Sequence, residues 1–347
     1  MYSFKNDYAE GAHPAILEAL NTSNLHQEQG YGEDQFSLNA KAALRTLISQ
    51  PSADIYFVAG GTLANQLVIS TLLRSHEAVI SAQSGHIYAN EAGAIEHGGH
   101  RIISLPAIDG KITPEQLYEV VNAHALRPHV VKPRLVYVSN STEWGTIYKK
   151  KELKALFKAC KALDLYLFMD GARLGHALMS PSNDLTMEDI GQLTDIFYIG
   201  GTKNGALLGE AIVFNDPTLS VDFDYLLKQR GALLAKGRVL GIQFYTLFGT
   251  SLYFDLAQKA NTHAQRLAQA FIQEGFEFYT PVESNQLFPI VPLKWVEEVS
   301  KKFAFYVWQP VDDLHVVVRL ITSWATDPDQ VDALIVEINR ANREAKS

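Results

Sequence analysis

Short apolar segments rich in β-branched and aromatic residues alternate with helix-like segments from about residue 54 to residue 214. Several of the apolar segments, such as LVYV and LYLFM, contain no polar residue except tyrosine, which is typical of strands covered on both faces of a parallel sheet. The alternation predicts an α/β fold with a mostly parallel sheet and helices on both of its faces. The expected strands are Asp54–Val58, Ala78–Ser81, Arg101–Leu105, Leu135–Ser139, Leu165–Asp170, Ile196–Ile199 and Ala211–Phe214.

The helix-like segments between these strands carry recognisable start signals. Thr113-Pro114-Glu115 places a capping residue before a proline in the first turn, and His13-Pro14 opens a second helix in the same way. Cys160 is the single cysteine and lies in the helical pattern KELKALFKACKAL. We therefore expect a packed small side chain there rather than a nucleophile. One cysteine cannot form an internal disulfide, which fits a reducing compartment.

The pattern changes at about residue 251, where a long amphipathic helix is expected over Leu252–Glu274. Short strands follow near FEFYT, QLFPIV, FAFYVW and VVVRLI, and a closing helix is expected over Asp329–Ala345. This order is typical of a small α+β domain. We predict a large domain over 1–250, with an N-terminal arm of about 45 residues that serves it, and a small domain over 251–347.

Charge and motif content argue against several classes of function. The chain has 30 basic and 38 acidic residues, a net charge of −8, with no basic block, which argues against binding to nucleic acid or to an anionic membrane. The N-terminus does not read as a signal peptide, and no apolar run is as long as a membrane span, so a cytoplasmic location is expected. The sequence has no P-loop and no strand-coupled GxGxxG pattern. His97-Gly-Gly-His100 has no third ligand nearby, and we interpret it as a turn rather than a metal site.

Three polar clusters directly follow expected strands: Gly60-Gly61-Thr62, Asp170-Gly171-Ala172-Arg173 and Gly201-Thr202-Lys203-Asn204. Because ligands of parallel α/β sheets bind beyond the carboxyl ends of the strands, one ligand could contact all three clusters. A helix start suits an anion, a carboxylate after a buried strand needs a cation or a donor, and a lysine between apolar runs is poorly solvated. Each cluster also has a plainer interpretation: a capped turn, a salt bridge between Asp170 and Arg173, and a surface lysine.

Taken together, the three clusters match the parts of pyridoxal 5′-phosphate (PLP). Its phosphate suits the helix start at Gly61 and Thr62, its ring nitrogen suits Asp170, and its aldehyde suits the amine of Lys203. A carboxylate beside the ring nitrogen would keep that nitrogen protonated, so that the ring accepts electrons from a bond broken at the substrate Cα. The convergence of three weak signals on one ligand favours this hypothesis over three unrelated structural features.

The sequence resembles the low-specificity L-threonine aldolase and β-eliminating lyase group of fold-type I PLP enzymes over nearly its whole length. This resemblance implies a seven-stranded sheet, PLP as cofactor, and cleavage of threonine-like β-hydroxy-α-amino acids into glycine and an aldehyde. It also implies a homo-oligomer in which two subunits share active sites, usually within a tetramer. The motifs that carry the resemblance are QGYGED (29–34), GGTLANQ (60–66), SGHIYANEAGA (84–94), MDGARL (169–174), GGTKNG (200–205) and VRLITS (318–323).

The resemblance also assigns roles to residues that bind the cofactor. It implies that Lys203 is the Schiff-base lysine, that Asp170 is the partner of the ring nitrogen, and that Gly61 and Thr62 bind the phosphate. His86, within SGHIYANEAGA, is similar to the histidine that stacks on the cofactor ring.

Further roles implied by the resemblance concern the substrate and the phosphate. Arg173 and Arg319 resemble the family's substrate-binding arginines, and a forked guanidinium suits a carboxylate. Arg173 is expected to contact the cofactor as well. Lys236 and Arg238 lie in LLKQRGALLAKGR, where relatives contact the phosphate, partly from a neighbouring subunit. A charged interface or a solvated face is the alternative for these two residues.

The chain also departs from the family's pattern around the substrate. Asn6-Asp7 stands where relatives commonly have Ser-Asp, and we expect Asn6 to bind the substrate carboxylate. The loop after the fourth strand has Thr142 and Glu143 in place of a histidine, and Ser323 replaces a second histidine. The base for the β-hydroxyl group is therefore His86, Glu143 or an ordered water.

These departures leave other activities open. A β-elimination, a racemisation or a transamination of another amino acid would use the same cofactor apparatus. A non-catalytic binding protein on the same fold is a third hypothesis, and the intact Lys203 and Asp170 argue against it.

Overall fold

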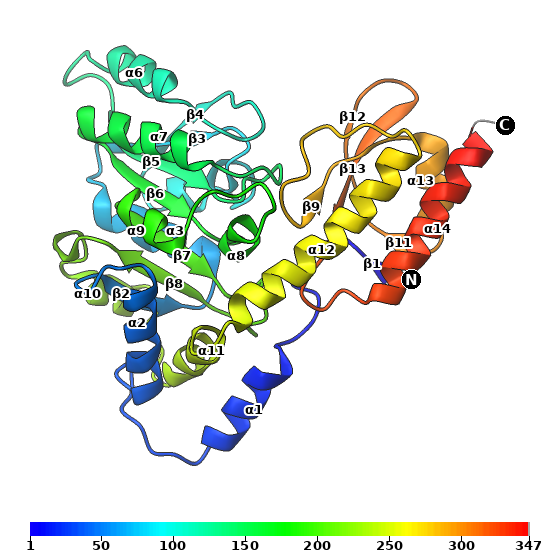
Figure 1. Cartoon of the computed structure of the whole chain (residues 1–347). Coiled ribbons are helices and arrows are strands. Elements are labelled where there is room, and N and C mark those ends of the chain that lie inside the picture. The colour runs from blue at the N-terminus through cyan, green and yellow to red at the C-terminus, as the bar shows by residue number, and fades with distance from the viewer. Residues whose placement is uncertain (346–347) are drawn as a thin grey trace.

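The computed structural model describes residues 1–345, with side chains described through residue 340. Its centre is a seven-stranded sheet in the order β2-β8-β7-β6-β5-β3-β4 (Figure 1). Strand β8 runs antiparallel to both of its neighbours, β2 and β7, and all other neighbouring strands are parallel. The predicted mostly parallel sheet and its seven strands are confirmed. The strands are β2 (Asp54–Val58), β3 (Glu77–Ala82), β4 (Arg101–Leu105), β5 (Lys132–Ser139), β6 (Tyr166–Asp170), β7 (Ile196–Gly200) and β8 (Glu210–Phe214).

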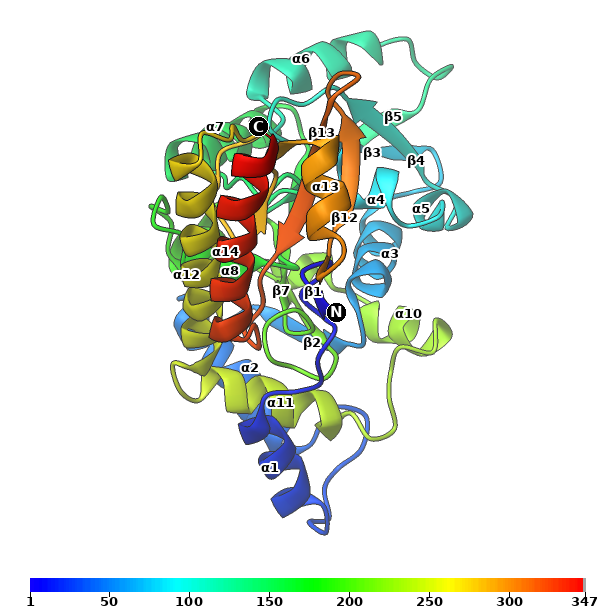
Figure 2. The same cartoon turned by 90° about the vertical axis from the view of Figure 1, so that its right-hand side faces the viewer.

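Helices cover both faces of this sheet (Figures 1 and 2). Both predicted helix starts are confirmed: Thr113 caps α6 in a capping box with Gln116, and the His13 side chain accepts a hydrogen bond from the Ala15 N–H group at the start of α1. Cys160 is fully buried in α7, as expected for a packing residue. The helices are α1 (Pro14–Ser23), α2 (Gln35–Leu47), α3 (Gly61–Leu72), α4 (His86–Ala89), α5 (Ala94–His97), α6 (Pro114–Ala123), α7 (Lys150–Ala162), α8 (Leu174–Leu178), α9 (Met187–Gln192), α10 (Phe223–Gln229) and α11 (Arg238–Phe248).

The apolar composition of the strands follows from burial on both sides. In β5, Leu135 and Tyr137 belong to one core cluster, whereas Val136 and Val138 belong to the cluster on the opposite face. Because successive strand residues point to opposite faces, a strand covered by helices on both sides has no position left for exposed polar groups. Polar residues are therefore confined to the strand ends, where a ligand can reach them.

The C-terminal part contains a second, smaller antiparallel sheet packed against three helices. In this sheet β13 (His315–Ile321) pairs with β9 (Gln286–Leu287), β10 (Ile290–Pro292) and β12 (Tyr306–Pro310). The long helix α12 (Leu252–Gln273) packs beside α14 (Pro328–Ala345), which in turn contacts α13 (Leu293–Val299) (Figure 2). The predicted long and closing helices are confirmed within one residue at each end.

Two features of the C-terminal part differ from or extend the predictions. The predicted strand near FEFYT is wrong, because this segment makes only an isolated bridge between Phe278 and Pro289. Pro289 has no N–H group to donate to a longer ladder. At the N-terminus, β1 (Tyr2–Ser3) pairs in parallel with β11 (Phe303–Ala304), so the first residues of the arm join the C-terminal part. The domain division at residue 250 stays a prediction.

In the described part of the chain, no helix combines the length and the apolar character needed to cross a membrane.

Candidate active site

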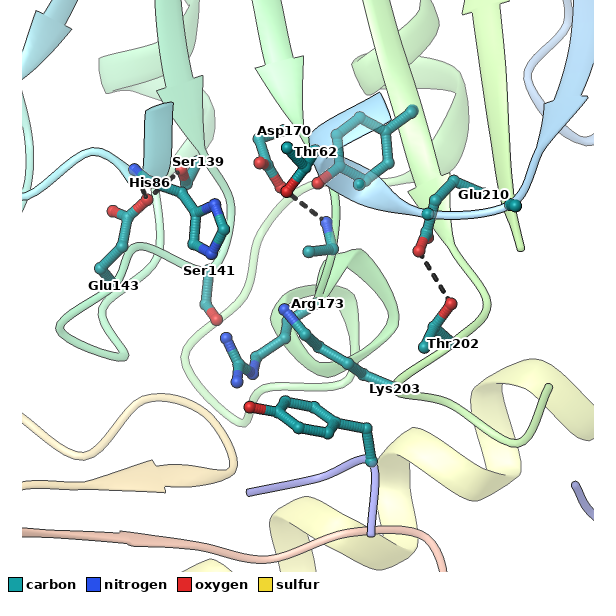
Figure 3. Close-up of a pocket in the computed structure, with 16 residues that line it drawn as sticks. Thr62, His86, Ser139, Ser141, Glu143, Asp170, Arg173, Thr202, Lys203 and Glu210 are labelled. Carbon is teal, nitrogen blue, oxygen red and sulfur yellow. Dashed lines mark hydrogen bonds between the residues drawn. The ribbon is translucent and has the colours of Figure 1, made fainter. Parts of the chain in front are cut away.

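A cavity of about 250 Å³ lies at the carboxyl ends of the central strands (Figure 3). Strands β2, β6 and β7 each end at this cavity, and the loop after β5 closes one side of it. The three polar clusters predicted to share one ligand therefore do come together. The predicted site residues that line the cavity are Gly61, Thr62, His86, Glu143, Asp170, Arg173 and Lys203.

Lys203 points into the centre of the cavity (Figure 3). Its loop is fixed on either side: the Gly201 N–H group donates to the Gly209 carbonyl at 2.9 Å, and the Asn204 amide donates to the Tyr253 carbonyl at 2.7 Å. Lys203 is half-buried and lines the cavity. Burial and, after it, the nearby Arg173 charge lower the pKa of the Lys203 amine. A lowered pKa makes an amine a better nucleophile near neutral pH.

Asp170 ends β6 and is held by neutral donors rather than by a salt bridge. Its Oδ2 accepts hydrogen bonds from the Tyr137 hydroxyl at 2.5 Å and from the Asn65 amide at 3.5 Å, and its Oδ1 accepts from the Ala172 N–H group at 2.9 Å. The alternative of an ion pair with Arg173 is wrong, because the Arg173 guanidinium pairs elsewhere. A carboxylate that has no salt-bridge partner can accept a hydrogen bond from a protonated ring nitrogen and stabilise its charge.

The partner of Arg173 is Asp7, which the sequence analysis did not single out. Arg173 Nε donates to Asp7 Oδ2 at 2.7 Å and its Nη2 donates to Oδ1 at 3.0 Å. The Asn285 amide adds a third hydrogen bond to Asp7 at 2.9 Å. Asp7 is fully buried; burial alone would raise its pKa, but the Arg173 charge holds it well below the ordinary value. The N-terminal segment therefore fixes the direction of a guanidinium in the cavity.

His86 and Glu143 lie on the opposite side of the cavity from Glu210 (Figure 3). His86 Nδ1 lies 2.8 Å from Glu91 Oε1, and this hydrogen bond raises the pKa of the imidazole. Glu143 Oε1 accepts from the His86 backbone N–H group at 2.8 Å and from the Ser139 hydroxyl at 2.7 Å. Burial raises the pKa of the Glu143 carboxyl. Thr142, its neighbour in sequence, is fully buried and bonds to Thr146 instead.

Two of the predicted substrate-binding residues lie outside the cavity lining. Arg319, on β13, places its Cζ 4.3 Å from the Trp308 ring centroid and 5.2 Å from that of Tyr306. Its Nε is buried and has no hydrogen-bond partner among the described residues. Burial and then the Arg173 charge lower its pKa to about 10. Asn6 accepts a hydrogen bond from the Tyr8 N–H group at 3.1 Å.

The two basic residues predicted near the phosphate also lie away from this chain's own cavity. Lys236 is exposed, and it does not line the cavity. Arg238 donates to the backbone carbonyls of His26 and Ser23 at 2.5 and 2.6 Å, which ties α11 to the segment after α1. A role for Lys236 at a neighbouring subunit's phosphate stays a prediction.

Glu210 is a cavity residue that sequence reasoning missed. It is the first residue of β8; Thr202 Oγ1 donates to its Oε1 at 2.9 Å, and the Gly201 N–H group lies 3.2 Å from its Oε2. Burial raises its pKa to about 8, against the opposing effects of the Thr202 hydrogen bond and the Lys203 charge. The sequence around Glu210 does not indicate that this residue lines a cavity. Its position depends on the antiparallel turn that brings β8 back beside β7.

The residues present fit PLP. Helix α3 begins at Gly61, and its N-cap residue Gly60 has no side chain to satisfy the first N–H groups, which leaves them for an anion. A Cβ atom at Gly61 would lie 2.9 Å from the Tyr198 hydroxyl, so only glycine keeps this surface open without displacing the tyrosine. Asp170 and Lys203 are placed for the ring nitrogen and the aldehyde.

Comparison with known proteins finds threonine aldolases that match nearly the whole chain. A low specificity L-threonine aldolase of a Pseudomonas species is 33% identical over 346 residues, with 96% of each chain covered. The Pseudomonas aeruginosa protein of the same description is 32% identical over the same length. The solved structure of Leishmania major threonine aldolase superimposes with a TM-score of 0.97 at 42% identity, covering 99% of this chain and 100% of that one.

More distant structures share the fold alone. Aspartate aminotransferase from Thermus thermophilus has a TM-score of 0.74 at 14% identity over 98% of this chain. The sequence model of the beta-eliminating lyase family matches residues 4–295. With that match and the relatives above, the chain belongs to the beta-eliminating lyase family.

Proposed function

We propose that this protein is a PLP-dependent aldehyde-lyase that cleaves the Cα–Cβ bond of L-threonine, L-allo-threonine and similar β-hydroxy-α-amino acids into glycine and an aldehyde. The observation that carries the proposal is the convergence of Lys203, Asp170 and the α3 N-terminus on one cavity. The aldolase relatives, which match the chain over almost its full length, support the choice of bond.

In this proposal four residues hold the cofactor. Lys203 holds it covalently, the N–H groups of Gly61 and Thr62 with the threonine hydroxyl hold its phosphate, and Asp170 holds its ring nitrogen. When bound, PLP supplies a ring that withdraws electrons from the substrate Cα.

Arg173 and Arg319 bind the substrate carboxylate, with Asn6 as a further contact. The Arg173 side chain cannot rotate freely, because its Nε and Nη2 donate hydrogen bonds to the two carboxylate oxygens of Asp7. The buried Nε of Arg319 has no hydrogen-bond partner within the described part of the chain, so it has hydrogen-bonding capacity left for an anion. Fixing the carboxylate fixes which bond of Cα stands perpendicular to the cofactor ring, and so which bond breaks.

The proton of the β-hydroxyl group goes to Glu143 in this proposal. Its pKa is raised by burial, which brings a carboxylate closer to the basicity needed at neutral pH. The pKa of His86 is raised by Glu91, so less of its imidazole is in the neutral form that can accept a proton. His86 then serves chiefly to cover the cofactor ring.

We also propose a cytoplasmic homo-oligomer, either a dimer that shares its active sites or a tetramer. The exposed position of Lys236, outside the cavity of its own chain, supports a contact with the cofactor site of a neighbouring subunit.

The test is product analysis with L-threonine, L-allo-threonine and phenylserine. Equal amounts of glycine and the matching aldehyde are expected. Glu143→Gln should lower kcat about 10²-fold or more, in the range of a lost general base, while PLP remains bound. Ammonia and a 2-oxo acid would instead indicate β-elimination, the D-enantiomer a racemase, and pyridoxamine phosphate a transaminase. Protein that binds no PLP would favour a non-catalytic role.

A further inference from the structure

Glu210 places a carboxyl group beside a site built for an anion. The register of β8 pairs Glu210 with Val58, the last residue of β2, and with Gly200, the last residue of β7. From Val58 the chain continues into the anion site at Gly61, and from Gly200 it continues to Lys203. Glu210 therefore lies between the helix start and the lysine, and it lines the same cavity (Figure 3).

The hydrogen bonds of this carboxyl group hold it in place. Glu210 is 4% exposed, and its two oxygens bond to Thr202 Oγ1 and to the Gly201 N–H group. Thr202 Oγ1 in turn accepts from the Gly209 N–H group at 3.0 Å. With the backbone on both sides fixed, Glu210 cannot turn away when a negative charge enters the cavity.

The charged and titratable groups around Glu210 make its ionised form costly once the cavity is filled. Lys203 stabilises the carboxylate, whereas Asp170 opposes it, and the buried hydroxyl of Tyr198 adds no charge at neutral pH. In the proposed function, a phosphate adds negative charge to the cavity. This charge favours the neutral form of the Glu210 carboxyl group.

We propose that Glu210 is protonated whenever the cofactor is bound, and that the neutral carboxyl group donates to Thr202 Oγ1 so that the Thr202 hydroxyl hydrogen turns toward the phosphate. The 2.9 Å separation between Thr202 Oγ1 and Glu210 Oε1 allows the hydrogen bond to run in either direction. At alkaline pH this proton comes from solvent and returns to solvent when the cofactor leaves. The bond between the Lys203 amine and the PLP aldehyde forms in a separate step that releases water. This inference rests on the proposed function, because it needs PLP at Lys203.

The direction of the expected pH dependence follows from the pKa of Glu210 before the cofactor binds. Since burial raises the pKa of Glu210 to about 8, its proton is already present below that pH and adds no pH dependence. Above it, binding must draw a proton from increasingly alkaline solvent. The affinity for PLP should therefore fall by up to about tenfold for each pH unit above the pKa.

The experiment measures the Kd of PLP between pH 7 and pH 9.5 for the wild-type protein, Glu210→Gln and Glu143→Gln. Lys203, the PLP ring and the phosphate titrate in all three proteins and change each Kd with pH in the same way. These shared effects cancel in the ratio of wild-type Kd to variant Kd, which is therefore the readout. In Glu210→Gln the amide donates to Thr202 without a proton from solvent. The ratio of wild-type Kd to Glu210→Gln Kd should rise by up to about tenfold per pH unit above pH 8. Glu143 is a second buried carboxyl in the same cavity, and its variant should parallel the wild type.

A second measurement needs no variant to fold. Infrared difference spectra of the wild-type protein with and without PLP at pH 8.5 should show a gain of protonated carboxyl on binding. Parallel pH curves for wild type and Glu210→Gln, weaker binding of Glu210→Gln at every pH, or no gain of protonated carboxyl would overturn the inference while the proposed function stands. Failure of the wild-type protein to bind PLP would overturn both.

Discussion

Replacing Asp7 with asparagine should both destabilise the protein and leave the Arg173 guanidinium without its fixed orientation. Asp7 is fully buried and accepts three hydrogen bonds, two from the Arg173 guanidinium and one from the Asn285 amide. Asparagine has nearly the same shape, but it removes the negative charge and turns one acceptor into a donor that faces other donors. The Arg173 cation is then left in the protein interior without its counter-ion.

Breaking a buried ion pair from one side costs about 3–5 kcal/mol. For a chain of 347 residues, an unfolding entropy of about 2.1 cal/mol/K per residue converts this loss into a fall in Tm of about 4–7 °C. The stabilisation depends on pH in a defined direction. Because the folded-state pKa of Asp7 is depressed, its contribution is complete above the unfolded-state value of about 3.9 and is lost as pH falls through the folded-state value.

The assay is thermal unfolding at pH 7, at one protein concentration and without PLP, so that ligand linkage does not contribute. Glu298→Gln is the matched control, because the Glu298–Lys301 pair is equally short at 2.7 Å but lies on the surface. Removing this solvent-screened pair should change the Tm only slightly. The KM for amino acid substrate should rise in Asp7→Asn and not in the control. A Tm change in Asp7→Asn no larger than in Glu298→Gln would refute the reasoning.

Two further predictions concern the anion site and the imidazole. Gly61→Ala should weaken PLP binding about 10- to 100-fold, because its Cβ would lie 2.9 Å from the Tyr198 hydroxyl. Gly11 lies outside the cavity lining, and a Cβ there meets no atom of the described residues within 4 Å, so Gly11→Ala should bind PLP as the wild type does. Equal affinities of the two variants in a PLP titration would contradict this assignment. In Glu91→Gln the pKa of His86 should fall, because the carboxylate that stabilises the imidazolium is gone. A histidine NMR titration that finds the same His86 pKa in this variant as in the wild type would show that Glu91 does not raise it.

The sequence predicted the sheet and the main cofactor residues because both depend on local order along the chain. Buried strands must be apolar, so the polar residues that a strand carries collect at its end. In a parallel sheet such ends meet, which is why Gly61, Asp170 and Lys203 could be placed at one site. The motif order then connected them to a family whose membership the comparisons show.

The residues that orient these groups could not be read from the sequence in the same way. Asp7 and Arg173 are separated by 166 positions, and Asp170 meets the Asn65 amide across 105 positions. Such pairs are created by tertiary packing, and a single sequence contains no signal for them. Glu210 was missed for a related reason: only the antiparallel course of β8 between β2 and β7 brings it next to the anion site and Lys203.

The most direct test of the account is the location of the covalent bond to PLP. The protein loaded with PLP is reduced with borohydride and digested, and the modified peptide is identified by mass spectrometry. If Lys203 forms the covalent bond to PLP, the wild-type protein has one modified residue, Lys203, and Lys203→Ala has none. A reduced adduct on another lysine such as Lys236, or none on wild-type protein that has been shown to be folded, would contradict it.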